Sequence, residues 1–232
     1  MNRSRLLVFA SGGEKPESGG SGFENLVMAS RDGRLNADIV GVVSNHANGG
    51  VRMRAHRLGI PFIHFTSPWN AERYQKIARD SDAHFFALSG WLQHVVGLDR
   101  TTRFSSKTVF NIHPGPLPEF GGNRMYGHHV HERVIGSFRR GERKNSAVSM
   151  HFVTEEYDSG PIFLHFPVTI DEFDTPETLA ARVNGWEHRL QPTVTDMVVK
   201  RLIRWDGVNP SSLVVPPNLN RLLALGDAPS SR

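Results

Sequence analysis

The fold class is decided by residues 5–26, RLLVFASGGEKPESGGSGFENL. A short apolar run typical of a buried strand (5–10) leads into a glycine-rich loop, and the loop leads into a helix-like segment. Repeated strand–loop–helix units with right-handed crossovers build parallel sheets covered by helices. This stretch therefore predicts the first unit of an α/β protein, with its loop at the carboxyl end of the first strand.

The alternation continues outward along the chain. Further strand-like runs occur at 37–44, 61–65, 84–89 and 108–112, and helix-like patterns occur at 51–58 and 70–82. Runs at 147–153 and 162–170, joined by a turn-rich segment, predict an antiparallel hairpin. A long helix is expected over 175–204, with Thr175 as N-cap and Pro176 in the first turn. The predicted fold is thus a mainly parallel, Rossmann-like sheet flanked by helices, with a C-terminal antiparallel hairpin and a long helix.

Composition narrows the class of protein. The chain has 232 residues, 38% of them hydrophobic and 22% charged, as in ordinary globular proteins. Cysteine is absent, which excludes disulfides, thiolate catalysis and cysteine-bound metals. The first apolar run is too short for a signal peptide, so we expect a cytoplasmic protein with no membrane partner. Periodicity fails after Trp205, which predicts a catalytic domain over 1–205 and a partly disordered surface tail over 206–232.

The formal charge of +4 is a mild excess that suits small anionic substrates better than nucleic acid. The densest basic run is 139–144, RRGERK, which we interpret as a solvated loop in preference to a phosphate-backbone patch. We therefore expect small-molecule partners and no nucleic acid. Either a monomer or a homodimer fits the sequence.

The glycine-rich loop at 11–26 is a candidate phosphate site. Such a loop leading into a helix offers free backbone N–H groups and the positive end of the helix dipole. It has neither the Gly-Lys-Ser/Thr ending of a Walker A loop nor the usual GxGxxG spacing. A flexible surface loop is the alternative, and the position directly after the first strand favours phosphate binding.

A second constellation combines Asn111, His113 and Asp158. Asn111 and His113 are two apart on a predicted strand, so their side chains leave the same face, and the following prolines stiffen the chain. An amide and an imidazole held in this way can stabilise an oxyanion, although a buried, hydrogen-bonded histidine at a strand end fits equally well. Asp158 lies in a turn, where aspartate is usually structural. If it faces His113, we expect it to orient the ring and raise the histidine pKa.

Other polar residues give weaker signals. His128, His129 and His131 form a cluster, but no acidic ligand lies at a recognisable spacing, so a metal site is disfavoured. No GxSxG elbow supports serine chemistry. Glu187, taken alone, is expected to face solvent.

Four segments in this order resemble the formyltransferases that use 10-formyltetrahydrofolate. They are NIHPGPLPEFGG (111–122), MYGHHVHERVI (125–135), HFVTEEYDSGPI (151–162) and ARVNGWEHRLQP (181–192). The resemblance extends over about 6–205 and is strongest to the branch that acts on glycinamide ribonucleotide in purine biosynthesis. It implies direct attack of the acceptor amine on the formyl carbon through a tetrahedral intermediate, with no metal.

The resemblance also implies a role for individual residues. The catalytic ones would be Asn111, His113 and Asp158. The substrate phosphate would be bound by Gly20, Ser21, Gly22 and Asn25, and the substrate amine by Glu187. The folate would be bound by Trp91, Leu92, Gln93, His94, Val95 and Tyr157.

Two departures and several rivals accompany the resemblance. The insertion GEKPES (13–18) lengthens the glycine loop, and Gln93 and His94 stand where relatives commonly have a basic residue. Three rival families of formyl-group enzymes are disfavoured because each differs from this chain in one feature. The tRNA formyltransferases have a second barrel domain, the formyltetrahydrofolate hydrolases have an extra N-terminal domain, and the sugar-nucleotide formyltransferases lack the glycine-rich loop. A formyltransferase for another small phosphorylated or nucleotide-linked amine, and a non-catalytic folate- or nucleotide-binding module, are the remaining alternatives.

Overall fold

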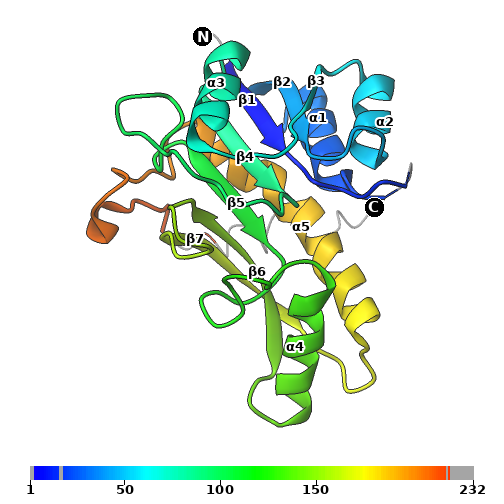
Figure 1. Ribbon diagram of the computed structural model, residues 1–232. Coiled ribbons are helices and arrows are strands. Elements are labelled where there is room, and N and C mark those ends of the chain that lie inside the picture. The colour runs from blue at the N-terminus through cyan, green and yellow to red at the C-terminus, as the bar shows by residue number, and fades with distance from the viewer. Residues whose placement is uncertain (1–2, 16–17, 218, 220–232) are drawn as a thin grey trace, which may run out of the picture.

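The computed structural model describes residues 3–15, 18–217 and 219, and its centre is a seven-stranded sheet in the order β3-β2-β1-β4-β5-β6-β7 (Figure 1). The strands are β1 (Ser4–Phe9), β2 (Ala37–Ser44), β3 (Phe62–His64), β4 (Phe85–Ser89), β5 (Val109–His113), β6 (Asn145–Phe152) and β7 (Ile162–Thr169). The helices are α1 (Ser21–Asp32), α2 (Gly50–Leu58), α3 (Ala71–Ser81), α4 (His128–Arg139) and α5 (Pro176–Val199). Strands β1 to β5 pair in parallel, whereas β6 and β7 are antiparallel. The predicted fold class is confirmed.

The strands bury both of their faces, as the apolar runs predict. On β1, Leu6 and Val8 join the core cluster that includes residues of α1, α2, α4 and α5. Leu7 and Phe9 point the other way, into a second cluster with Tyr74 of α3. The helices therefore cover the sheet unequally, with α3 and the segment that follows β4 on one face and the other four helices on the opposite face.

Helix α5 starts where the sequence predicts and ends earlier. The Thr175 and Thr178 side chains form a capping box with each other's backbone N–H, and Pro176 opens the helix. The expected end at Arg204 is wrong, because the chain turns after Val199 and Arg201 adopts a left-handed conformation with φ of 61°. Neither α5 nor any other helix in the described part combines enough length and apolarity to cross a membrane.

Residues 206–217, in the segment expected as a tail, make specific contacts with the rest of the described chain. Trp205 donates its indole N–H to the Asn209 carbonyl, and Arg204 pairs with Val214 in an isolated antiparallel bridge. Leu213 and Val215 pack on the main core cluster, and Leu219 is 5% exposed. Burying these apolar side chains offsets the cost of ordering irregular backbone in 206–217. Residues 218 and 220–232 of the predicted tail lie outside the described residues.

The order of the strands also locates a crevice. The chain moves from β1 outward to β2 and β3, and then returns to β4 on the other side of β1. In open α/β sheets, ligands bind beyond the carboxyl ends of the strands at this reversal point. Here the loops after β1 and β4 are joined, because Ser11 N–H donates to the Gly90 carbonyl and Leu92 N–H donates to the Ser11 hydroxyl, both at 2.9 Å.

Candidate active site

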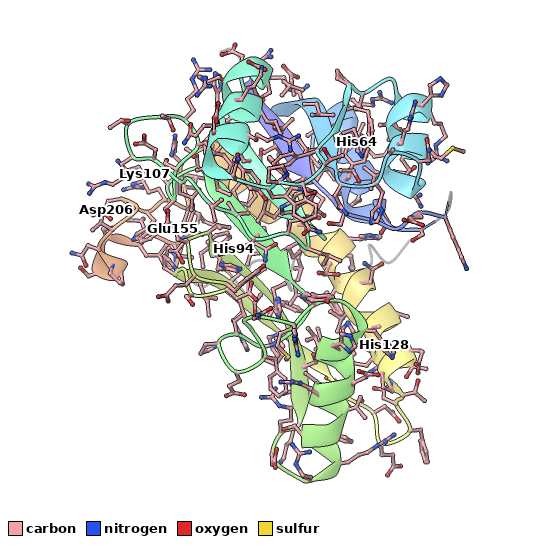
Figure 2. The ribbon with its side chains drawn as sticks, viewed as in Figure 1. His64, His94, Lys107, His128, Glu155 and Asp206 are labelled. Carbon is pink, nitrogen blue, oxygen red and sulfur yellow. The ribbon has the colours of Figure 1, made fainter. Side chains whose placement is uncertain are left out.

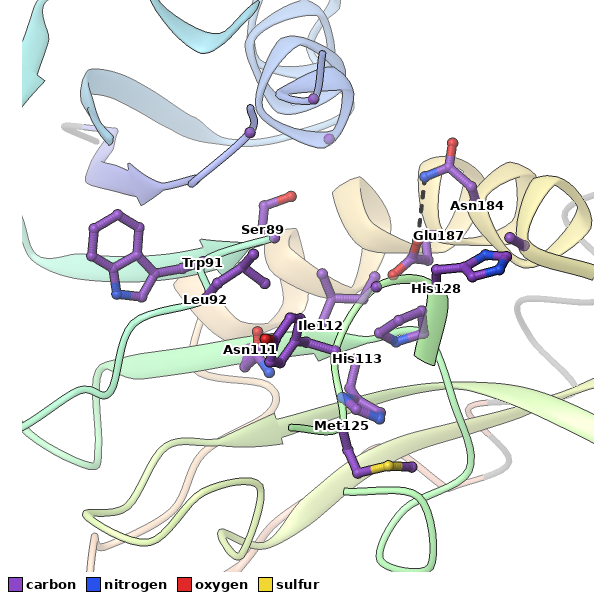
Figure 3. Close-up of a pocket in the computed structure, with 18 of the residues that line it drawn as sticks. Ser89, Trp91, Leu92, Asn111, Ile112, His113, Met125, His128, Asn184 and Glu187 are labelled. Carbon is purple, nitrogen blue, oxygen red and sulfur yellow. Dashed lines mark hydrogen bonds between the residues drawn. The ribbon is translucent and has the colours of Figure 1, made fainter. Parts of the chain in front are cut away.

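A cavity of about 750 Å³ lies at this end of the sheet and is lined by residues of the loops after β1, β4 and β5, of the Asp158 turn and of α5. Figure 3 shows Asn111 and His113 on β5, Trp91 and Leu92 after β4, and Glu187 on α5 around the same space. Ten of the expected site residues line it: Gly20, Ser21, Gly22, Trp91, Leu92, Asn111, His113, Tyr157, Asp158 and Glu187. Asn25, Gln93, His94 and Val95 are not among the lining residues.

Asp158 is the centre of the polar cluster on the cavity floor. Its Oδ1 lies 3.3 Å from His151 Nε2 and 3.5 Å from Asn111 Nδ2. Its Oδ2 accepts from Gly122 N–H at 3.0 Å and lies 3.8 Å from His113 Nδ1. Asp158 also has a φ of 52°, a left-handed conformation that aspartate tolerates better than most residues. The turn thus aims its carboxylate into the site.

The cluster keeps Asp158 ionised. Burial acts to raise the pKa of Asp158, but the hydrogen bond from His151, the charges of His113 and His151, and the Gly122 N–H together hold it below its usual value. The resulting carboxylate is a fixed negative charge beside both imidazoles.

His113 differs from the expectation. Its Nε2 lies 2.7 Å from the Phe120 carbonyl, which can only accept, so Nε2 carries the proton and Nδ1 faces Asp158. Burial lowers the pKa of His113, and this outweighs the opposite effects of the Asp158 charge and the Phe120 carbonyl. The expected rise in the His113 pKa is therefore wrong for this state of the protein, and burial favours the neutral ring.

His151 also belongs to the Asp158 cluster, although it is not among the site residues predicted from the sequence. The antiparallel register places His151 of β6 directly opposite Asn111 of β5, which brings both side chains to one face of the sheet. His151 Nδ1 lies 2.8 Å from the Phe152 carbonyl, so this nitrogen donates and holds the ring with Nε2 toward Asp158. The signal in the sequence is a histidine four residues beyond the start of the predicted strand at 147–153, but it is informative only once the pairing of the two strands is known.

The glycine loop leads directly into α1, as expected, and the helix begins at Ser21. Gly20 is its N-cap, with φ of 80° and no side-chain cap, so the first backbone N–H groups stay available. A Cβ on Gly22 would lie 2.2 Å from the Ser89 hydroxyl, so only glycine fits where α1 meets the end of β4. The helix N-terminus opens into the cavity and presents N–H donors to an anion.

The Asn25 side chain forms a hydrogen bond that links two helices. Pro192 lies inside α5 and has no N–H, so the carbonyl of His188, four residues earlier, loses its helical partner. Asn25 Nδ2 donates to that carbonyl at 2.6 Å. The side chain therefore joins α1 to α5 behind the cavity wall.

One polar face of α5 forms the opposite wall. Asn184, Glu187, His188 and Gln191 recur at helical spacing and all line the cavity. Asn184 Nδ2 donates to Glu187 Oε2 at 3.3 Å, and His188 Nε2 lies 3.1 Å from the Ser21 hydroxyl (Figure 3 shows the first of these). Burial raises the pKa of Glu187 to about 7. Glu187 thus faces the cavity and not bulk solvent, which corrects the expectation drawn from the residue alone.

The segment after β4 and the loop that carries Asp158 close one side of the cavity. The rings of His94 and Tyr157 stack with centroids 4.5 Å apart, and His94 Nε2 lies 2.6 Å from the Glu155 carbonyl (Figure 2). Tyr157 and Leu92 are each 40% exposed at the cavity rim, while Val95 is buried in the α3-side core. His94 therefore holds the Asp158 loop from outside the cavity.

The three clustered histidines of α4 do not converge. His128 lies 3.3 Å from Glu177 and 3.5 Å from Glu132, His129 lies 3.0 Å from Glu132, and His131 is buried against the cavity. Within residues 3–15, 18–217 and 219, no three His, Asp or Glu side chains are placed to hold a metal ion.

Comparison with known proteins agrees with this geometry. The model of a family described as formyl transferase matches residues 4–195. A phosphoribosylglycinamide formyltransferase of Arabidopsis thaliana chloroplasts is 34% identical over 89% of this chain and 70% of its own length. The Bacillus subtilis enzyme of that name is 30% identical over 82% of this chain and 92% of its own. The crystal structure of glycinamide ribonucleotide transformylase 1 from Symbiobacterium toebii superposes with a TM-score of 0.74 at 25% identity, over 89% of this chain and 92% of its own. The chain belongs to the formyl transferase family.

Proposed function

We propose that this enzyme transfers the formyl group of 10-formyltetrahydrofolate to the amine of glycinamide ribonucleotide, giving formylglycinamide ribonucleotide and tetrahydrofolate in purine biosynthesis. The observation that carries the proposal is the convergence, in one cavity, of a helix N-terminus suited to phosphate, the Asn111–His113–Asp158 cluster and an aromatic rim. Relatives that are 30–34% identical over most of the chain have names with this activity.

The acceptor phosphate would bind at the N-terminus of α1. Gly20, Ser21 and Gly22 supply the backbone N–H groups, and His188 holds the Ser21 hydroxyl. Asn25 supports this site indirectly, through its hydrogen bond to the α5 backbone. Glu187 would hold the acceptor amine, since it is the acidic side chain on the α5 wall of the cavity.

The folate co-substrate supplies an activated formyl carbon. Trp91, Leu92 and Tyr157 line the side of the cavity that would hold its pterin ring, and flat aromatic and apolar surfaces suit such a ring. Gln93, His94 and Val95 would shape this wall from behind, with His94 holding the Tyr157 loop in place.

The polar cluster would act on the charge that develops during transfer. Asn111 Nδ2 offers an amide N–H to the formyl oxygen as it becomes negative. His113 Nδ1 is free to take up, through water, the proton that the attacking amine loses, and Asp158 stabilises the resulting imidazolium beside the oxyanion. With the help of Asp158, the same proton would then pass to N10 of the folate as the bond between N10 and the formyl carbon breaks, which gives tetrahydrofolate.

The proposal extends to the organisation of the protein. The catalytic domain would span 1–205, with 206–232 as a C-terminal extension, and the enzyme would act in the cytoplasm as a monomer or homodimer. Sedimentation and cell fractionation test these points, and the plant relatives named chloroplastic make the compartment worth measuring.

The test is a spectrophotometric assay of folate product, with and without glycinamide ribonucleotide. Turnover that requires the ribonucleotide supports the proposal. Turnover without it indicates a hydrolase and contradicts the proposal. Folate binding without turnover indicates another phosphorylated amine or a binding module, and the inserted residues 13–18, which precede the phosphate site in the sequence, would then be the region to examine.

A further inference from the structure

His131 is an imidazole in the catalytic cavity that has no assigned role. It lies in the second turn of α4, it is only 4% exposed, and it lines the cavity. Its Nδ1 is sealed from solvent without a hydrogen-bond partner. Buried polar atoms in native proteins are nearly always paired, so an unpaired one inside an active-site cavity needs a functional explanation.

The surroundings of His131 keep the ring neutral. Burial lowers the pKa of His131 to about 4, and the neighbouring His128 and His113 act in the same direction. An unpartnered N–H at the sealed Nδ1 would be a lost donor, so the favoured tautomer carries its proton on Nε2, at the edge of the ring that meets the cavity. His131 lines the cavity, and its Nε2 is not among the buried nitrogens without a partner, so this N–H is the one that the side chain can offer to a ligand.

The position of His131 is set by close packing at the start of α4. Val130, the preceding residue, would lie 2.5 Å from a Cβ on Gly115, so only glycine allows the helix to approach the end of the His113 segment this closely. Helix α4 also packs against α5, and His128 reaches Glu177 of α5 at 3.3 Å. His131 is therefore held between the His113 segment and the α5 wall that carries Glu187.

We propose that His131 is a further binding residue for the formyl acceptor, and that its cavity-facing N–H donates to the amide carbonyl beside the reacting amine. The inference rests on the proposed function, which places that amine between His113 and Glu187. An amide carbonyl taken out of water needs a donor, and an uncharged imidazole supplies one without repelling the amine. The sealed, unpartnered Nδ1 supports this assignment because it favours the tautomer that keeps the donating proton on Nε2.

The test compares three substitutions at one position. His131→Phe keeps a ring of similar size and removes both nitrogens, whereas His131→Gln places an amide N–H near the position of Nε2. A single neutral hydrogen bond is worth roughly five- to tenfold in binding. We expect His131→Phe to raise the acceptor KM by about that factor, with the folate KM unchanged, and His131→Gln to stay within about twofold of the wild type. His131→Asn, whose amide lies near the sealed Nδ1 position, should resemble His131→Phe.

Thermal unfolding separates this role from a structural one. His131→Phe removes an unpaired buried nitrogen and fills its place with apolar atoms, so the midpoint should not fall. His129→Phe is the matched control, since His129 lies on the same helix, is exposed and pairs with Glu132. It should change neither KM.

Three results would overturn the inference. If His131→Phe leaves the acceptor KM unchanged, the proposed hydrogen bond does not form. If His131→Phe and His131→Gln raise the acceptor KM equally and both lower the unfolding midpoint, the role of His131 is structural. A wild-type enzyme that does not formylate glycinamide ribonucleotide overturns the proposed function and this inference together. That outcome is distinguishable, because the failure of His131 alone leaves the wild type active.

Discussion

Asn25 is expected to stabilise the junction of α1 and α5 and not to bind phosphate directly. Its amide donates at 2.6 Å to the His188 carbonyl, which Pro192 has left without a helical partner. Asn25→Ala leaves this partly buried carbonyl unpaired, and such a group costs about 1–3 kcal/mol. Because the bond is short and Pro192 removes the N–H that would normally pair with this carbonyl, we expect a loss of about 2 kcal/mol in the free energy of unfolding.

A double-mutant cycle with Pro192→Ala tests the explanation. Alanine at 192 restores a backbone N–H four residues after His188, so the helix itself can pair the carbonyl. In that background Asn25→Ala should cost less than about 0.5 kcal/mol, which makes the coupling between the two sites about 1–2 kcal/mol. Urea unfolding followed by circular dichroism measures all four free energies, and equal m-values would show that the compared states are the same.

A second residue of α1 provides the control for the double-mutant cycle. Met28→Ala, on the exposed side of α1, should show no coupling to Pro192→Ala. Additivity of Asn25→Ala and Pro192→Ala within about 0.3 kcal/mol would refute the assigned hydrogen bond. If Asn25→Ala leaves the stability unchanged but abolishes acceptor binding, Asn25 binds the acceptor phosphate directly.

Three more predictions follow from the cavity. Asn111→Ala or His113→Ala should lower kcat by about 10²–10³ with an unchanged circular dichroism spectrum, and near-normal turnover would contradict the oxyanion role. Gly22→Ala should raise the acceptor KM, because its Cβ would meet the Ser89 hydroxyl at 2.2 Å, and adding Ser89→Ala should reverse the effect. Burial raises the pKa of Glu187 to about 7 from 4.5, so the folded protein keeps a proton that the unfolded chain releases, and stability falls as pH rises through that window. Glu187→Gln should abolish this fall in stability, measured by urea unfolding at a series of pH values, and should raise the acceptor KM. If the variant and the wild type show the same pH dependence of stability, the pKa of Glu187 is not raised in the folded protein.

Local patterns were sufficient for the fold because each strand and helix carries its own signal. The apolar runs are buried on both faces, so their composition marks strands of a parallel sheet without knowledge of their partners. Thr175 and Pro176 mark the start of α5 by capping chemistry alone. The end of α5 was not predictable in the same way, since the turn after Val199 depends on Leu213 and Val215 packing on the core and on the pairing of Arg204 with Val214.

The site was predictable only where its geometry lies within one segment. Asn111 and His113 share a face because they are two apart on one strand, which the sequence states directly. His151 joins them through the register of β6 against β5, and a shift of one residue would have turned it to the other face. The role of Asn25 depends on a proline that lies far away in the sequence.

The charge on His113 depends on a balance that no motif contains. A carboxylate near an imidazole favours the charged ring, and this led to the expected rise in the His113 pKa. In the structure Asp158 divides its hydrogen bonding between Gly122 and His151 and stays 3.8 Å from His113 Nδ1, while His113 itself is only 4% exposed. Burial therefore outweighs the attraction in the free enzyme. A neutral His113 has a free Nδ1, so it can gain its proton when an oxyanion forms beside it, and the stabilising charge then appears in the transition state and not before it.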